Sequence, residues 1–397
     1  MEEERPLTGI SPAGRIAAPG EGIGQDELAL AARNHGLPLE ALRYEVTPAG
    51  LHYVLVHYDI PDTGAYTDAG TRTDAGTYTD AGTIPATPPA PGHTPWRLTV
   101  RGHVRTPLDL TPDDLRSLPS VTHRVTMECA GNGRARLSPR PVSQPWLVEA
   151  VGTAEWTGVP LRAVLAEAGV TPEAVEAVFT GADHGVERGV EQDYRRSLPL
   201  PVAVGGDVLL AHTMNGGPLP PQHGHPLRLV VPGWYGMAHV KWLRDIELVG
   251  AAFRGYQQAT AYRLRQSPGE PGEPVTRIAP RALLIPPGFP DFMSRTRIVG
   301  PGPVRLAGRA WSGHGPVVRV ELSSDGGAGW ADGEVLPQGA HPYAWQGWHA
   351  DWTAVPGRHI LLVRATDASG RTQPVEQPWN RGGFANNQTQ AVSVVCR

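Results

Sequence analysis

Glycine and proline interrupt this sequence too often for long helices to be its main elements. Its 397 residues include 48 glycines and 41 prolines. Both residues destabilise helix interiors, and proline also removes a backbone hydrogen bond. The apolar residues between them fall in many short runs, as in strands separated by turns. The sequence therefore predicts a loop-rich, mostly β protein of the α+β class.

Length and charge narrow the class of protein further. The chain is long enough for two domains, and apolar residues make up 40% of it, which suffices for a sizeable core. The 35 basic and 39 acidic residues nearly balance, so we expect neither nucleic acid nor a membrane as a partner. No apolar run approaches the length of a membrane span.

The compartment is predicted from the cysteines and from the first residues. Cys129 and Cys396 lie far apart in the sequence, so no disulfide framework and no oxidising compartment are indicated. The start, MEEERPLTGI, lacks the basic and then apolar pattern of an export signal. We therefore expect a cytoplasmic protein, or a periplasmic one if a leader has been removed.

The first part of the chain should hold a short helix at 26–33 and a strand within GLHYVLVHYDIP, residues 50–61. A six-residue repeat follows at 67–83, TDAGTRTDAGTYTDAGT. Because the repeat is low in apolar residues, we expect residues 62–93 to form a solvated low-complexity insertion without chemistry. Strands and short helices then alternate up to about residue 249.

The pattern changes near residue 295 to short strands separated by glycine and aspartate turns, as in VVRVELSSDGGAGW and HILLVRATDASG. This spacing is typical of a β-sandwich of the immunoglobulin type. We place a boundary in SPGEPGEP, which predicts one domain over 1–272 and a second over 273–397.

Cys129 follows a predicted strand, VTHRVTME, and precedes the turn-forming run AGNG and Arg134. Most free cysteines are small buried hydrophobic residues. No CxxC motif or nearby histidine pair indicates a zinc site, and a nucleophilic cysteine would need a base. A third interpretation is a single thiolate ligand to a metal that brings its other ligands with it.

Two further stretches hold basic residues in a turn-rich context. Arg33 and His35 flank Asn34 where the predicted helix ends, which fits either a helix C-cap or an anion contact. The second stretch, PQHGHPLRLVVPGWYGMAHVKW, brings together His223, His225, Arg228, His239 and Lys241. Two histidines could bind zinc, but the set lacks a third ligand, so a phosphate or another anion fits the cluster better.

Four motifs together resemble the sulfite oxidase family of molybdenum-pterin enzymes. They are RNH at 33–35, CAGNGR at 129–134, HGHPLR at 223–228 and HVKW at 239–242, in the family's order. The resemblance covers nearly the whole chain, including AWSG and VVRVELSSDGG at the start of the family's dimerisation domain. It implies a molybdopterin domain followed by an immunoglobulin-like sandwich, and a homodimer.

The resemblance also implies a cofactor site. Cys129 would be the single protein thiolate on molybdenum, with no haem in this chain. The positions that match those holding the pterin and its phosphate are Asn34, His35, Asp183, His223, Arg228, His239, Val240 and Lys241. Cationic and N–H donors suit a phosphate, and a carboxylate suits the N–H groups of a pterin.

The family's substrate pocket is a cage of arginines with a tyrosine and a tryptophan. Arg33 and Arg134 match two of the cage arginines, Tyr262 matches the tyrosine and Trp146 the tryptophan. Planar guanidinium groups suit a small oxyanion such as sulfite. The family's third arginine lies in WNLRG, whereas this chain has WNRGG, so Arg381 is displaced by one residue.

The implied activity is oxidation of sulfite to sulfate, with electrons passed to an external acceptor, either dioxygen or a cytochrome. One alternative is a nitrate reductase or another oxyanion or oxo-transfer reductase of the same superfamily. A second is a non-catalytic binding protein with a degenerate oxidase domain. A zinc hydrolase using His223 and His225 is a more distant alternative.

Overall fold

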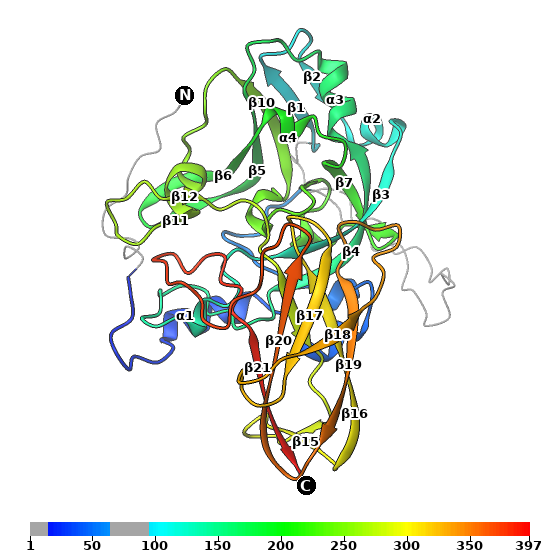
Figure 1. Cartoon of the computed structure of the whole chain (residues 1–397). Coiled ribbons are helices and arrows are strands. Elements are labelled where there is room, and N and C mark those ends of the chain that lie inside the picture. Colours follow the sequence, from blue (N-terminus) through cyan, green and yellow to red (C-terminus); the bar gives the residue numbers. More distant parts are fainter. Residues whose placement is uncertain (1–14, 64–94) are drawn as a thin grey trace, which may run out of the picture.

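A computed structural model describes residues 15–63 and 95–397. Figure 1 shows a region of sheets and short helices around β1 to β12, and below it the long strands β16 to β21 that run toward the C-terminus. The protein is therefore mostly β, as the sequence predicts. In the described part, none of the helices has both the length and the apolarity needed to cross a membrane.

The first sheet is mixed and has the strand order β2-β1-β10-β5-β6. Its strands are β1 Leu98–Gly102, β2 Leu108–Leu110, β5 Glu176–Glu187, β6 Val190–Pro199 and β10 Leu243–Val249. Only β1 and β10 are parallel, and the other pairs are antiparallel. The β5–β6 hairpin has a register shift between Thr180 and His184, which bends the strand beside the site described below.

The second sheet is antiparallel and carries the CAGNGR motif at the end of its first strand. It has the order β3-β4-β7-β8, and β9 also pairs with β7. Its strands are β3 Val121–Glu128, β4 Val151–Pro160, β7 Leu209–Met214, β8 Gly217–Pro218 and β9 Arg228–Val230. A two-stranded ribbon of β11 Arg263–Leu264 and β12 Glu273–Pro274 follows.

Helices are short and begin and end at residues that favour such boundaries. The α-helices are α1 Gln25–Arg33, α2 Pro112–Ser117, α3 Leu161–Ala168 and α4 Leu200–Ala203. Thr111 and Asp114 form a reciprocal capping box at the start of α2, and Gly169, with φ of 68°, ends α3. The remaining turns are η1 Leu39–Arg43, η2 Ala49–Leu51, η3 Arg134–Arg136, η4 Pro221–His223, η5 Gly236–Ala238 and the π-helical η6 Gln257–Ala261.

The C-terminal strands fold into two layers that enclose one apolar core. One layer contains β13 Arg281–Leu284, β16 Gly302–Trp311 and β19 Gln346–Ala354, and the other contains β14 Phe289–Pro290, β15 Arg297–Val299, β17 Val317–Ser323, β20 Gly357–Asp367 and β21 Gln390–Cys396. β18 Ala331–Val335 pairs with both β17 and β19. Buried side chains of both layers, such as Trp348 and Leu361, pack in this core. The sandwich that the sequence predicts is therefore present.

Local predictions hold at most elements and fail at one. The helix at 26–33 and the strand before Cys129 are confirmed. The strand predicted within 50–61 is wrong, since that segment makes only an isolated bridge between His35 and Val54. Residues 52–58 of this segment instead line the two cavities described below. The repeat at 67–83 lies outside the described residues, and the boundary at 272 stays a prediction.

Candidate active site

Cys129 lies directly after β3, in a tight turn at the edge of the second sheet. Its N–H donates to the carbonyl of Ala150 at 2.9 Å, and its own carbonyl accepts from Asn132 at 3.0 Å. The Sγ atom accepts from the N–H of Gly131 at 3.4 Å. Burial raises the pKa of the thiol, although the charge of Arg134 acts in the opposite direction. A thiolate here would therefore need a cation beside it.

Two cavities meet at this cysteine. The inner cavity extends toward β9 and Lys241. The outer cavity lies on the other side, between α1, Arg134 and Tyr262. Cys129, Leu55, His57 and Tyr262 line both cavities. The sulfur is thus placed where a group held in the inner cavity would face the outer one.

The inner cavity brings together five of the eight residues that the sequence assigns to the cofactor. They are Asp183, His223, Arg228, His239 and Lys241. Within the part of the chain that the structure describes, three buried atoms among them have no hydrogen-bond partner, namely Asp183 Oδ1, His223 Nε2 and Arg228 Nε. Buried polar groups are nearly always paired, so this cavity is built for a polar occupant.

Charge in the inner cavity fits an anion. Arg228 is buried, donates to the carbonyl of His223 at 3.0 Å, and has no carboxylate partner among the described residues. Its guanidinium lies 4.6 Å from the ring centre of Trp156, and burial lowers its pKa to about 10. Burial likewise lowers the pKa of Lys241 and raises that of Asp183. A bound phosphate would stabilise both cations.

His239 lies in the wall of the inner cavity, but both of its ring nitrogens are already used. Nδ1 accepts from the N–H of Val231 at 3.1 Å, and Nε2 donates to the carbonyl of Trp234 at 3.0 Å. Burial lowers its pKa to about 3, so the ring is neutral. This histidine therefore orders the loop between β9 and β10, and its side chain has no free donor for a cofactor.

The outer cavity brings together the four residues that the sequence assigns to substrate, Arg33, Arg134, Trp146 and Tyr262. Arg134 is buried, its Nε donates to the carbonyl of Gly382 at 3.0 Å, and its guanidinium lies 5.0 Å from the ring centre of Phe384. Its two terminal nitrogens have no hydrogen-bond partner in the described part of the chain. Buried cations are normally paired, so this one can receive an anion.

The glycines of the motif allow this placement of Arg134. A Cβ on Gly131 would lie 2.8 Å from Arg134 Cζ, and one on Gly383 would lie 2.7 Å from its Cγ. Gly133 has φ of 90°, in the region that favours glycine, and a Cβ there would meet Asn386 at 2.9 Å. The position of Arg134 therefore requires glycines in the segment after Cys129, because side chains there would clash.

The sequence reasoning missed His57 and His52, which line the inner cavity. The His57 Nε2 atom and the Tyr262 hydroxyl are hydrogen-bonded at 2.7 Å. Burial lowers the pKa of His57 and raises that of Tyr262, so both groups are neutral. His52 is also buried, and burial lowers its pKa to about 4, so its ring is neutral as well. The available signal was the pair of histidines in an otherwise apolar segment.

Two of the predicted residues, His35 and Val240, line neither cavity, and the side chain of a third, Asn34, already has its hydrogen-bond partners. His35 is exposed and donates from Nε2 to the carbonyl of His52 at 3.1 Å. Val240 is buried in the apolar core, and Arg381 lines a separate neighbouring cavity. Asn34 lines the outer cavity, but its amide is used by backbone groups and by Gln144. Cofactor contacts by His35 and Val240 side chains thus find no support in this geometry.

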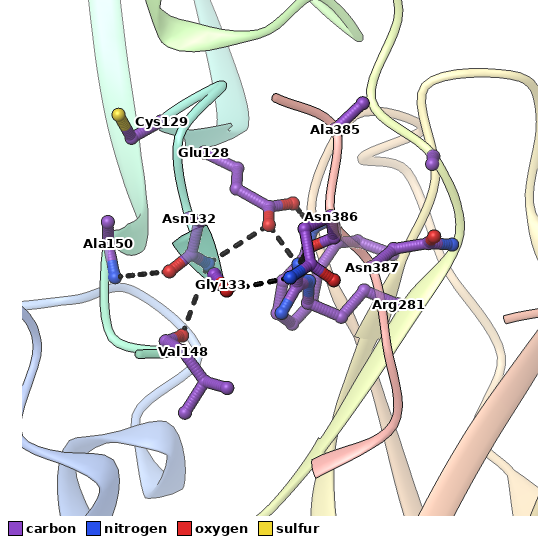
Figure 2. A network of polar contacts seen from close by, with 12 residues as sticks. Glu128, Cys129, Asn132, Gly133, Val148, Ala150, Arg281, Ala385, Asn386 and Asn387 are labelled. Carbon is purple, nitrogen blue, oxygen red and sulfur yellow. Dashed lines mark hydrogen bonds and ion pairs between the residues drawn. The ribbon is translucent and has the colours of Figure 1, made fainter. Parts of the chain in front are cut away.

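A buried ion pair ties the residue before Cys129 to the C-terminal strands (Figure 2). Arg281 Nε of β13 lies 2.8 Å from Glu128 Oε1, and both side chains are 1% exposed. Trp311 Nε1 of β16 donates to the other carboxylate oxygen at 2.8 Å. Asn132 Nδ2, in the turn itself, donates to Glu128 at 3.0 Å. The carboxylate thus joins the turn to the sandwich.

A second contact with the C-terminal part of the chain holds the same turn at Gly133, as Figure 2 shows. Asn386 Nδ2 donates to the carbonyl of Gly133 at 2.6 Å. The backbone carbonyl of Asn386 in turn accepts from Arg281. The Cys129 turn is therefore held at Glu128 and at Gly133 by residues more than a hundred positions away.

The described residues contain no cluster of three or more histidine, cysteine or acidic side chains that could hold a metal ion. The zinc interpretation of His223 and His225 therefore lacks a ligand set. A metal at Cys129 would have to bring most of its ligands with it.

Family models match both parts of the chain. Residues 84–257 match the oxidoreductase molybdopterin binding domain, and residues 289–396 match the Mo-co oxidoreductase dimerisation domain. The chain is 34% identical over 307 residues to the mitochondrial sulfite oxidase of Rattus norvegicus and 36% identical over 314 residues to the sulfite oxidase of Gallus gallus. These matches cover 72% and 74% of this chain, and 55% and 67% of those proteins.

Two other similarities extend over more of the chain. Nitrate reductase [NADH] 1 of Oryza sativa subsp. japonica is 30% identical over 392 residues, which cover 91% of this chain and 40% of that protein. The crystal structure of the sulfane dehydrogenase SoxCD from Paracoccus pantotrophus superposes with a TM-score of 0.70 at 26% identity, over 97% of this chain and 93% of that one. The chain spans only about half the length of the rat protein.

Proposed function

This chain belongs to the sulfite oxidase family of molybdopterin oxidoreductases, and from that membership we propose that it oxidises sulfite to sulfate. The observation that carries the proposal is the position of Cys129 at the junction of two cavities. One cavity holds unpaired buried donors for an anionic cofactor, and the other holds an unpaired buried arginine for an anionic substrate.

The inner cavity suits molybdopterin. Arg228, Lys241 and His223 would hold its phosphate, and the free Oδ1 of Asp183 would accept from N–H groups of the pterin. Cys129 would be the protein's thiolate on molybdenum. When bound, this group supplies the two-electron redox centre. His239 acts indirectly, by ordering the loop through its two backbone hydrogen bonds.

The outer cavity suits sulfite. Arg134 would bind one oxyanion edge through its two free terminal nitrogens, and Arg33 at the rim would add a second charge. Tyr262 would orient the anion through its hydroxyl and, with His57 at 2.7 Å, hold a proton near the reacting atoms. Sulfite and one water give sulfate, two protons and two electrons, which pass to an external acceptor, dioxygen or a cytochrome.

The test is a metal analysis run beside a sulfite-dependent ferricyanide assay on the same purified sample. We expect roughly one molybdenum per chain and sulfite turnover. Molybdenum without sulfite turnover would contradict sulfite as the substrate. Protein without molybdenum, made in a host that supplies the cofactor, would support the non-catalytic binding protein instead.

Reduction of nitrate or another oxyanion is the second candidate, favoured by the rice relative that covers 91% of this chain. An assay of nitrate consumption with reduced methyl viologen tests it on the same sample.

For the compartment, both cysteines are buried and unpaired, which fits our proposal of the cytoplasm.

Arg134→Gln should raise the KM for sulfite about 10- to 100-fold. The substitution removes charge-assisted hydrogen bonds, each of which contributes ~1.5–3 kcal/mol. Steady-state kinetics measure the effect. Arg136→Gln is the matched control, because it removes the same charge two residues away, where the side chain donates to the carbonyl of Thr389. An unchanged KM in Arg134→Gln would exclude this arginine from the substrate pocket.

The turn between β14 and β15 is the proposed contact of a homodimer. Phe292 and Met293 are each 84% exposed there, within the region that matches the dimerisation model. Exposed apolar side chains of this size mark interaction surfaces. Phe292→Glu with Met293→Glu should convert a dimer to a monomer in size-exclusion chromatography with light scattering. Val318→Glu, 59% exposed on β17, is the control, and a dimer that persists in the double variant would refute this contact.

A further inference from the structure

The turn of the β5–β6 hairpin contains an arginine in an unfavourable backbone conformation. Glu187 and Val190 form the last pair of the hairpin, so Arg188 and Gly189 are its two turn residues. Their φ angles are 51° and 79°. Turns of this kind favour asparagine, aspartate or glycine at the first position, and other residues are rare there. Such an outlier suggests that the side chain serves a function.

Arg188 lines the outer cavity together with Cys129 and Arg134, and it also lines the neighbouring cavity. Within the described ranges its guanidinium has no carboxylate and no hydrogen-bond partner. The neighbouring Glu187, which also lines the outer cavity, instead accepts from Gln257 Nε2 at 2.7 Å. Arg188 is thus a free cation at the mouth of the substrate cavity.

Arg188 and Arg134 also lie close enough to affect one another. Burial lowers the pKa of the Arg134 guanidinium, and the positive charge of Arg188 acts in the same direction. With Arg33 they place three guanidinium groups around one cavity. Their mutual repulsion would be relieved by an anion, and more by a dianion than by a monoanion.

Arg381 does not supply the third guanidinium group of the outer cavity. It lines only the neighbouring cavity, and its backbone N–H donates to the carbonyl of Arg265. The displacement of this arginine by one residue in WNRGG therefore leaves the outer cavity without a cation from the C-terminal segment.

We propose that Arg188 is the third arginine of the substrate pocket and that it makes the pocket selective for doubly charged oxyanions. The inference rests on the proposed function for the identity of the substrate, but the anion site itself does not depend on turnover. Arg33, Arg134 and Arg188 come from α1, the turn after Cys129 and the β5–β6 hairpin, so a dianion would be held between arginines of three separate segments.

Arg188→Asn tests the proposal, because asparagine is favoured at positive φ and the hairpin should fold at least as well. We expect the KM for sulfite and the Kd for inorganic sulfate, measured by titration calorimetry, each to rise about ten-fold. The kcat should change less than about two-fold, and the Kd for nitrate should rise less than that for sulfate. Arg188→Lys should restore part of the affinity.

Arg358→Gln is the control, since it removes an exposed arginine from β20 in the sandwich, and its constants should match those of the parent. Unchanged sulfate and sulfite constants in Arg188→Asn would overturn the proposal, as would a parent protein that binds no sulfate. Sulfate binding that weakens in Arg188→Asn, in a protein without sulfite turnover, would uphold Arg188 and refute the proposed function.

Discussion

Cys129→Ser is expected to abolish sulfite turnover and to remove most of the bound molybdenum, while the fold remains. Serine has nearly the same shape, and the thiol accepts only a long hydrogen bond from the N–H of Gly131 and a contact from Trp146 among the described residues. A soft metal, however, prefers a thiolate strongly to a hydroxyl. Metal analysis, the ferricyanide assay and the thermal midpoint of the same sample measure the three quantities.

The matched control is Cys396→Ser, which removes the other cysteine from the core of the sandwich, far along the chain from the cavities. It should cost some stability, because it buries a hydroxyl, but it should keep molybdenum and turnover. Full turnover in Cys129→Ser would end the molybdenum interpretation of this cysteine.

Arg281→Leu is expected to lower the free energy of unfolding by about 3–5 kcal/mol, since it leaves the carboxylate of Glu128 buried without its cation. Both side chains are 1% exposed, so water cannot replace the lost partner. The loss should appear as a lower urea midpoint in denaturation followed by tryptophan fluorescence, because Trp311 contacts the same carboxylate.

Two variants separate charge from packing. Arg281→Leu combined with Glu128→Gln removes both charges and should recover more than half of the lost stability. Arg364→Leu breaks a pair with Glu321 in the same sandwich, but the arginine is 25% exposed, so its removal should cost only about 1 kcal/mol. Equal losses of unfolding free energy in Arg281→Leu and Arg364→Leu would show that burial does not increase the contribution of the Glu128 pair to stability.

The motif residues that line the two cavities lie near the ends of strands, and local sequence patterns can identify strand ends. Cys129 follows β3, and Arg228 and Lys241 flank β9 and β10, so turn signals and apolar runs placed them correctly. Within the motif RNH, Arg33 and Asn34 line the outer cavity, whereas His35 lines neither cavity. Helix α1 ends at Arg33, and the extended backbone of Asn34 turns His35 outward to solvent.

What the sequence did not reveal depends on contacts between distant segments. His57 meets Tyr262 across 205 positions, and Glu128 meets Arg281 across more than 150. The apolar run around His57 predicted a strand because such a run indicates which side chains are buried, and not what they are buried against. Arg188 gives no local signal of function, since its unusual feature is a backbone angle.

The carboxylate of Glu128 couples the docking of the sandwich to the ordering of the cysteine turn. Docking of the sandwich and ordering of the cysteine turn use the same contacts of Arg281, Trp311 and Asn386. By reciprocal linkage, whatever binds the ordered turn must tighten the junction, and whatever loosens the junction must weaken that binding by the same factor. Loading of the site and resistance to cleavage between the two parts are therefore expected to rise together.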